Sequence, residues 1–144
     1  MNPYMEFVHK ADLAYGAMCH SLCRELNLTQ TAFDILLFLA NNPKRDTASD
    51  IVEIRKIKAN LVSVNVNRLV EEGYLRRDTI PGDRRKTRLL CTDKAQPIIR
   101  RGRALQARFA ERLLIGMNDA QKQAFANAIA VIDHNLDEIL EELS

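Results

Sequence analysis

The sequence predicts a mainly α-helical chain with one small β-hairpin. Along most of the 144 residues, apolar side chains recur three and four positions apart, which is the spacing of one face of an α-helix. The spacing changes around Pro81-Gly82, where two short runs with β-branched and apolar residues flank a strong turn signal. Charge is also sorted along the chain, because residues 44–103 hold 16 Lys and Arg against 8 Asp and Glu, whereas the rest holds 5 against 11. We therefore expect helical ends that flank a basic module of helices and a hairpin.

Two helices are predicted before the basic helix-and-hairpin residues. Residues 4–26 carry apolar side chains at the helical spacing, which favours a long amphipathic helix. Thr29 is a suitable N-cap for a second helix that runs to about Ala40, because its hydroxyl can accept a bond from a free amide of the first turn. Residues 41–43, Asn-Asn-Pro, end that helix. Four apolar side chains of the second helix are expected in the core, namely Phe33, Leu36, Leu37 and Ala40.

Two shorter helices follow. Thr47 and Asp50 have the spacing of a capping box, which predicts a third helix over about 48–54. The fourth helix is expected over about 58–72, and Gly73 stands where a residue in the left-handed conformation would end it. The buried side of the fourth helix is expected to consist of four apolar residues, Val62, Val66, Leu69 and Val70.

The β-hairpin is predicted from two strands, residues 74–80 and 87–92, joined by the residues PGDRRK. Two helices then complete the chain, over about 94–115 and 119–142. Pro97 lacks an amide hydrogen, so it predicts a late start or a kink in the first of these two helices.

The last helix has its own start signal. Asn118 and Gln121 are three residues apart, as the two partners of a capping box are. The helix is therefore expected to begin directly after Asn118.

A helix-turn-helix followed by two strands has the parts of a winged helix. The second helix of such a pair enters the DNA major groove, N-terminal half first. Asn can bind adenine there, Ser can bond to several bases, and Val can meet a thymine methyl group. Asn and Ser are poor helix formers, so helix stability does not explain them on the outer face of the fourth helix; a merely solvated polar face is the alternative interpretation. The candidate residues of this helix are Lys58, Asn60, Ser63, Val64, Asn67 and Arg68.

The predicted hairpin concentrates six cations on two short strands and a turn. Such a cluster favours a polyanion as partner. An Arg at a narrow tip can enter an A/T-rich minor groove, and cations along the strands can hold phosphates. Asp83 is expected to brace an Arg rather than to contact DNA, and a solvated basic face is again the alternative. The candidate residues of the hairpin are Arg77, Asp83, Arg84, Arg85, Lys86 and Arg88, beside Arg76.

Residues 68–92, RLVEEGYLRRDTIPGDRRKTRLLCT, resemble the wing region of the MarR family of bacterial transcriptional regulators. Asp83 and Arg85 match the family's Asp-x-Arg wing tip, and Leu90 and Thr92 match its closing Leu-x-Thr. The stretches LNLTQTAFDILLFLA (26–40) and ERLLIGMNDAQKQAFANAI (111–129) resemble further helices of the family, in the right order.

The resemblance implies a homodimer that grips double-stranded DNA. Residues 1–28 and 94–144 would form a helical dimerisation region, and residues 29–93 the winged helix-turn-helix. The dimer would read a pseudo-palindromic operator with half-sites roughly 10 bp apart. Arg85 would enter the minor groove, braced by Asp83, and Arg84 could share either role. The expected function is a sequence-specific regulator, in the first instance a repressor, that a small-molecule effector releases from DNA.

Two positions depart from the family pattern. Many members have Arg where this chain has Val64, so a groove contact common in the family is missing. Ala95 stands where the family usually has Gly after the second strand. The first departure affects the expected operator sequence, and neither affects the expected fold.

The cysteines raise a second functional hypothesis, a redox-sensing regulator. Cys19 and Cys23 lie one helical turn apart, but nearer the end of the first helix than the reactive cysteine of redox-sensing relatives. Cys19 shares an apolar stripe, so a buried structural cysteine is the preferred interpretation, while Cys23 is less clearly buried. Both remain candidate redox thiols. Cys91 is expected in the core.

Several other classes of function are not expected. The histidines are scattered and form no ligand pattern with the cysteines, so neither a metal nor a cofactor is predicted. No phosphate-binding loop or nucleophile motif is present, so the chain is not expected to be an enzyme. The N-terminus lacks the apolar run of a signal peptide, and the three cysteines fit no disulfide framework, which predicts a cytoplasmic protein without a membrane segment. A winged helix that binds an acidic protein instead of DNA is the remaining alternative.

Overall fold

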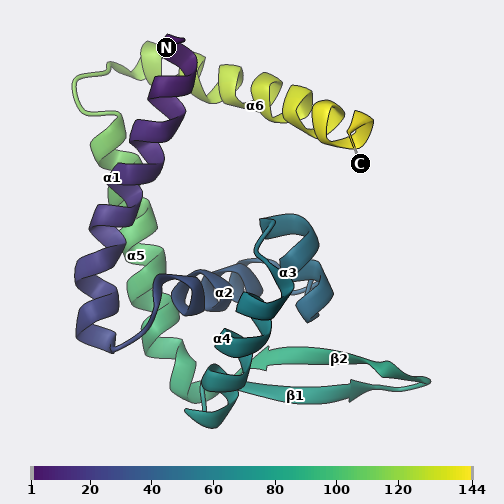
Figure 1. The fold of residues 1–144 in the computed structure, drawn as a ribbon. Coiled ribbons are helices and arrows are strands. Elements are labelled where there is room, and N and C mark those ends of the chain that lie inside the picture. Colours follow the sequence, from purple (N-terminus) through teal and green to yellow (C-terminus); the bar gives the residue numbers. More distant parts are fainter. Residues whose placement is uncertain (1, 144) are drawn as a thin grey trace. The chain divides into compact units, whose positions relative to one another are not determined.

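The computed structural model describes residues 2–143, apart from the side chains of residues 84 and 85. The chain is mostly helical and contains one antiparallel hairpin, which confirms the predicted fold class (Figure 1). None of the described helices is both long and apolar enough to cross a membrane. The elements in chain order are α1 (Pro3–Leu26), α2 (Gln30–Asn41), α3 (Ala48–Arg55), α4 (Ala59–Glu71), β1 (Leu75–Ile80), β2 (Asp83–Cys91), α5 (Gln96–Leu113) and α6 (Asp119–Glu142).

The chain divides into two compact units, Met1–Phe109 and Ala110–Ser144. The hydrophobic core of the first unit lies around α2. Seven of the twelve residues of this helix are buried, so its buried residues are not confined to one face. The sequence predicted only one inward face for this helix; the structure covers it with α1, α4 and β2. The buried residues of α2 are Ala32, Phe33, Ile35, Leu36, Leu37, Phe38 and Leu39.

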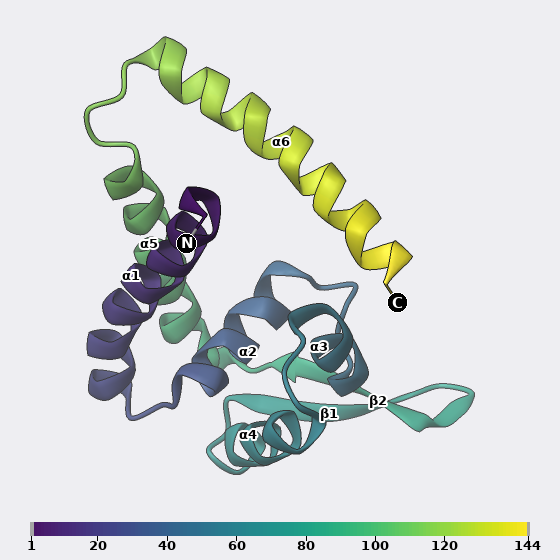
Figure 2. The same ribbon diagram turned by 45° about the horizontal axis from the view of Figure 1, so that its top comes forward.

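Within the first unit, α1 and α5 lie side by side and run in opposite directions (Figures 1 and 2). Near the end of α1, Glu25 accepts a hydrogen bond of 2.7 Å from the Arg101 guanidinium, which holds the pKa of Glu25 below its usual value. Further up, the rings of Tyr15 and Phe109 meet edge to face at 5.3 Å between centroids. Contacts thus join the end of one helix to the beginning of the other, as an antiparallel pair requires.

The predicted N-terminal caps are confirmed. Thr29 accepts a hydrogen bond of 3.0 Å from the amide of Ala32, and the Thr47–Asp50 capping box opens α3. Helix α5 begins at Gln96, after a single 3-10 turn, so Pro97 lies in its first turn and accounts for the late start.

The hairpin turn is tighter than the sequence predicted. Strand β2 begins at Asp83, so only Pro81 and Gly82 form the turn, whereas we expected the second strand to begin at residue 87. Gly82 has a φ of 87°, which L-residues with a side chain seldom adopt and which a type II turn requires at the residue after its Pro. The strand register shifts between Thr79 and Ile80, and this irregularity accommodates the extra residues of β2.

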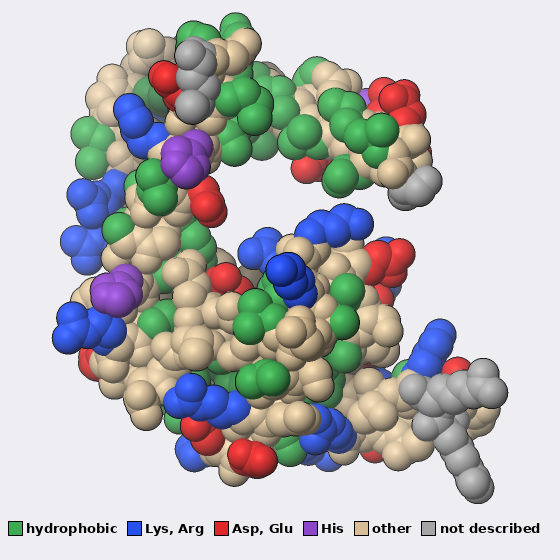
Figure 3. Space-filling model, viewed as in Figure 1, with side chains coloured by type: hydrophobic (Ala, Val, Ile, Leu, Met, Phe, Trp, Pro, Cys, Tyr) green, Lys and Arg blue, Asp and Glu red, His purple; other side chains and the backbone are tan. Residues whose placement is uncertain are grey.

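In the second unit, α6 begins at the predicted capping box of Asn118 and Gln121. None of its described residues is buried, although apolar side chains are frequent along it (Figure 3). Those exposed to at least 44% recur at positions 129, 132, 136, 139, 140 and 143, while Val131, which is also exposed, lies outside this spacing. The spacing of three and four places them on one face of the helix.

Candidate nucleic-acid interface

Helix α4 presents the expected polar face. Its buried side contains Val62, Val66 and Leu69, as predicted, while Val70 is half-buried and packs against the core. On the opposite side, Asn60, Ser63, Val64 and Asn67 are all exposed, and 65% of the Val64 surface is accessible. Lys58 occupies the N-cap position of α4 and is exposed, without a side-chain cap bond. The structure thus brings the predicted base-reading residues together on one exposed helix face.

The hairpin extends away from the helices of the first unit (Figures 1 and 2). Beyond Leu75 of β1, which is buried, the next four residues of that strand are exposed, so both strand faces meet solvent. Arg76, Arg77, Lys86 and Arg88 are exposed, and Asp83 is half-buried. Arg84 and Arg85 belong to β2, but their side chains lie outside the described part of the chain.

A contact joins the hairpin to α4. The Arg77 guanidinium donates a hydrogen bond to Oδ1 of Asn67. Because the carbonyl end of the Asn67 amide is turned towards Arg77, its NH2 group is left to point elsewhere. A groove of about 530 Å³ lies between α3, α4 and the hairpin, and Ser49, Ser63, Arg77 and Thr87 are among its lining residues.

The base of the hairpin is fixed to the segment before α3 through Asp46. The Asp46 carboxylate accepts a hydrogen bond of 2.7 Å from Nε of Arg88 and forms an ion pair with it. The Asp46 carbonyl accepts a second bond of 2.7 Å from the Leu89 amide, and Thr47 pairs with Arg88 as an isolated bridge. Sequence reasoning missed this role of Asp46, since 42 residues separate the two ion-pair partners and no local pattern marks the contact.

Among the predicted DNA-contacting arginines whose side chains the structure describes, two have carboxylate partners. Arg88 is held by Asp46. Arg68 is half-buried and pairs with Glu72 at 2.9 Å, and its Nη2 donates to the Asn27 carbonyl at 3.2 Å. These contacts hold both guanidinium groups in place.

Asn65 is a buried polar residue of α4 that was not predicted from the sequence. The Thr29 hydroxyl donates a bond of 2.7 Å to its Oδ1, and its Nδ2 donates one of 2.9 Å to the Leu61 carbonyl. Asn65 therefore links α4 to the first turn of α2. The signal was present, because position 65 lies three residues after Val62 and four before Leu69, on the buried face. Leu61, a large apolar residue of α4 that is 44% exposed, was also not singled out from the sequence.

The two candidate redox thiols are buried. Cys19 is fully buried and 5% of Cys23 is exposed, so the structural interpretation of Cys19 extends to Cys23. Burial raises the pKa of both thiols, that of Cys23 to about 11, which opposes the reactive thiolate. Cys91 is half-buried against the core, and burial raises its pKa as well.

A cavity of about 260 Å³ lies between α1, α2 and α5, with Arg55 at the end of α3. Its polar lining includes Tyr15, Asp34, Arg55 and Gln106. Desolvation raises the pKa of Asp34, and the charge of Arg55 opposes that shift. Among the residues that the structure describes, no group of three or more His, Cys, Asp and Glu side chains is placed to hold a metal ion.

Comparison with known proteins agrees with this geometry. Residues 26–86 match the model of the MarR family. A MarR protein from Peptoclostridium difficile DA00132 has a TM-score of 0.85 at 17% identity, over 99% of this chain and 93% of that one. A MarR-family transcriptional regulator from Listeria monocytogenes, solved in complex with a 26mer DNA, has a TM-score of 0.82 at 18% identity, over 96% and 91%. A MarR transcriptional regulator from Methanosarcina mazei Go1 has a TM-score of 0.76 at 21% identity, over 93% and 99%.

The family match covers α2, α3, α4, β1 and the start of β2, which are the elements that carry the exposed polar helix face and most of the basic hairpin. The structural matches extend the same fold over nearly the whole chain. Residues 26–86 therefore match the MarR family, and the chain as a whole has a winged-helix fold similar to that of the MarR proteins.

Proposed function

We propose that the protein is a homodimeric, sequence-specific DNA-binding regulator that represses transcription and is released by a small-molecule effector. The observation that carries this proposal is the exposed face of α4, where Asn60, Ser63 and Asn67 lie beside a hairpin rich in exposed cations. A solved relative with this fold is in complex with a 26mer DNA, which supports double-stranded DNA as the partner.

Base reading is assigned to the N-terminal and central part of α4. The amides of Asn60 and Asn67 suit adenine or another base edge with donors and acceptors, and Val64 suits a thymine methyl group. The bond from Arg77 turns the Asn67 carbonyl inward and leaves its NH2 group for an acceptor on the DNA. Lys58 would contact a phosphate at the start of the helix, where the helix dipole also favours an anion.

The hairpin is assigned to the minor groove and the phosphates. We propose that Arg85 enters the groove with Asp83 bracing it and Arg84 beside it, and that Lys86 contacts the backbone. Arg68, Arg77 and Arg88 form intramolecular bonds, so they would contact phosphates only through the donors that these bonds leave free.

Dimerisation is assigned to α1, α5 and α6. In α6, no described residue is buried, although one face carries a continuous apolar stripe. In α1, large apolar side chains near the start are also exposed, namely Tyr4, Met5, Phe7, Val8 and Leu13. Exposed apolar surface on this scale is typical of an interface between subunits.

Effector release would require a ligand site that adjoins both the winged helix and the helices assigned to dimerisation. The cavity between α1, α2 and α5 lies beside the helices assigned to dimerisation and beside α2, which carries the core of the winged helix. A ligand there could alter the spacing of the two DNA-binding lobes. The alternative of a redox switch has no support from Cys19 and Cys23, whose burial and raised pKa disfavour oxidation.

The proposal is tested by fluorescence anisotropy with duplex DNA from upstream of the protein's own gene, titrated over a range of salt concentrations. About six phosphate contacts per dimer predict a slope of log affinity against log salt near −5. Arg85→Ala should weaken binding to all duplexes, whereas Arg108→Ala on α5, which removes the same charge, should not. Absent or salt-insensitive binding would contradict the proposal and favour an acidic protein as partner.

A further inference from the structure

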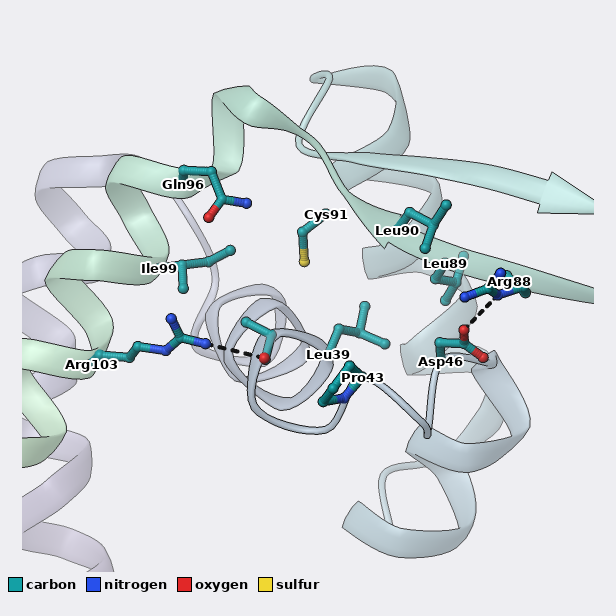
Figure 4. A pocket seen from close by; sticks show the side chains of 11 residues that line it. Leu39, Pro43, Asp46, Arg88, Leu89, Leu90, Cys91, Gln96, Ile99 and Arg103 are labelled. Atoms are coloured by element: carbon teal, nitrogen blue, oxygen red, sulfur yellow. Dashed lines mark hydrogen bonds and ion pairs between the residues drawn. The ribbon is translucent and has the colours of Figure 1, made fainter.

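A second cavity lies on the other side of α2, where α5 and β2 meet it (Figure 4). It has a volume of about 280 Å³. We call it the α2–β2–α5 pocket. Leu39 and Ala40 come from α2, Leu90 and Cys91 from β2, and Ile99 from α5. Between its charged ends the wall is aliphatic apart from the Cys91 sulfur and the Gln96 amide, and no aromatic side chain lines it.

Two arginines lie at opposite ends of this pocket, and one has an acidic partner while the other has neutral partners (Figure 4). Arg88 forms its ion pair with Asp46, which also lines the pocket. Arg103 instead donates to two neutral oxygens, Oδ1 of Asn41 at 3.0 Å and the carbonyl of Ala40 at 3.1 Å. Among the described residues, no carboxylate forms an ion pair with Arg103.

The charge of Arg103 acts inside the pocket. It lowers the pKa of the Cys91 thiol against the larger effect of burial, so the positive potential extends across the aliphatic wall to β2. A guanidinium with neutral partners beside an apolar wall is suited to a carboxylate, which would accept two parallel hydrogen bonds from it. The rest of such a ligand would lie against the leucines and Ile99.

The size and lining of the pocket define the class of ligand. If each non-hydrogen atom takes about the 30 Å³ that a water molecule occupies in the liquid, the pocket holds roughly nine of them. An aliphatic wall offers an extended hydrocarbon chain close contacts along its length, and it offers no ring on which an aromatic ligand could stack. These properties fit a carboxylate of about six to eight carbon atoms.

We propose that the α2–β2–α5 pocket binds a short aliphatic carboxylate, held by Arg103, and that the bound ligand loosens the base of the hairpin. Leu90 lines the pocket and directly follows Leu89, whose amide bonds to the Asp46 carbonyl. A chain inserted between α2 and β2 would press on this part of β2 and on the Asp46–Arg88 pair at the pocket's far end. The same strand carries the hairpin cations, so ligand binding would weaken DNA binding; this effect rests on the proposed function, but the site itself does not.

Calorimetric titration of the full chain with octanoate tests the site. Octanoate should bind, while octanamide, which has the same length and no charge, should bind about tenfold or more weakly. Arg103→Gln should cause a similar loss, and so should Ala40→Leu, which fills the pocket and leaves Arg103 in place. Arg108→Gln, an exposed arginine on the same helix outside the pocket, is the matched control and should bind octanoate normally.

Each result decides the proposal. Lack of octanoate binding to folded protein, or equal binding to Arg103→Gln, would overturn the site. If the site is correct, saturating octanoate should raise the dissociation constant for DNA about fivefold or more in the wild type and not in Arg103→Gln. Unchanged DNA affinity at saturation would overturn the link to the hairpin. A protein that binds octanoate but no DNA would refute the proposed function and leave the site intact.

Discussion

Asp46 is the residue through which the body of the winged helix positions the hairpin. Its carboxylate holds Arg88 and its carbonyl holds the Leu89 amide, both at 2.7 Å. Neither contact requires DNA. Asp46 is thus a positioning residue, and its contribution to binding would come from fixing where the hairpin cations lie.

Asp46→Ala should weaken DNA binding severalfold, because the freed hairpin loses part of its fixed orientation. Removing one negative charge near DNA would by itself strengthen binding, so the sign of the change separates the two effects. Asp133→Ala on α6 removes the same charge from an exposed position and serves as the control. Anisotropy titrations at one salt concentration give the comparison; stronger binding by Asp46→Ala would contradict the positioning role.

The redox hypothesis depends on two single residues, Cys19 and Cys23. With a pKa of about 11, Cys23 is present as thiolate at about one part in 10⁴ at pH 7. We expect iodoacetamide to modify Cys19 and Cys23 slowly in the folded protein and rapidly in denaturant. Mass spectrometry of the peptides measures both rates. Rapid modification of either residue in the native state would revive the redox hypothesis.

At the scale of elements, the packing of α5 on α2 depends on a glycine. A Cβ at Gly102 would lie 2.7 Å from Cδ2 and 3.0 Å from Cγ of Leu37, a side chain that is itself 2% exposed. Leu37 belongs to the hydrophobic core and also lines the cavity between α1, α2 and α5, so it could admit the Cβ only by shifting three of its own atoms. The sequence shows a glycine within a helix but not the reason for it, since the reason lies on another helix.

Gly102→Ala and Gly16→Ala form a matched pair in two helices. Alanine at position 16 would meet only Oε1 of Gln30 at 3.8 Å, so its better helix propensity should stabilise the fold by about 0.5–1 kcal/mol. At position 102 the collision with Leu37 should outweigh the same gain and cost about 1–3 kcal/mol. Urea denaturation of both variants measures the sign of each change in the free energy of unfolding. An equally stabilised Gly102→Ala would show that α5 is free to move away from α2.

The start of the second hairpin strand could not be predicted from the local sequence. The sequence correctly predicted a turn at Pro81-Gly82, because both residues have distinctive backbone preferences. It placed the start of the second strand at residue 87, because residues 83–86 are charged and polar. Asp83 belongs to the strand because it pairs with Ile80 across the turn. The strand propensities of single residues do not contain this pairing.

At the scale of the whole molecule, the chain leaves more apolar surface exposed than a single folded copy needs. The clearest example is α6, whose apolar stripe includes Ile132, Leu136 and Ile139, each about half-exposed. The charged residues of α6 occupy other positions, as is usual for a helix that packs against a partner. This surface is what the proposed dimer would bury.

We expect light scattering after size exclusion to give about twice the chain mass of 16.4 kDa. Leu136→Glu should shift the protein towards the monomer, because it places a charge within the apolar stripe. Gln123→Glu introduces the same charge at an exposed polar position of α6 and should leave the dimer unchanged. A wild-type protein that elutes as a monomer would refute the proposed dimer. Circular dichroism serves as the control that the Leu136→Glu variant is folded.

The sequence by itself determined the order of the elements, their caps, the outer face of α4 and the basic hairpin, because these depend on local spacing and on residue type. Only the tertiary structure decided how distant residues use one another: Asp46 with Arg88, Asn65 with Thr29, Gly102 with Leu37, and Arg103 with neutral partners at a pocket. Such pairs lie far apart in the chain and meet only when the helices pack. Burial then settled the cysteines, since the exposure of a thiol depends on everything that surrounds it.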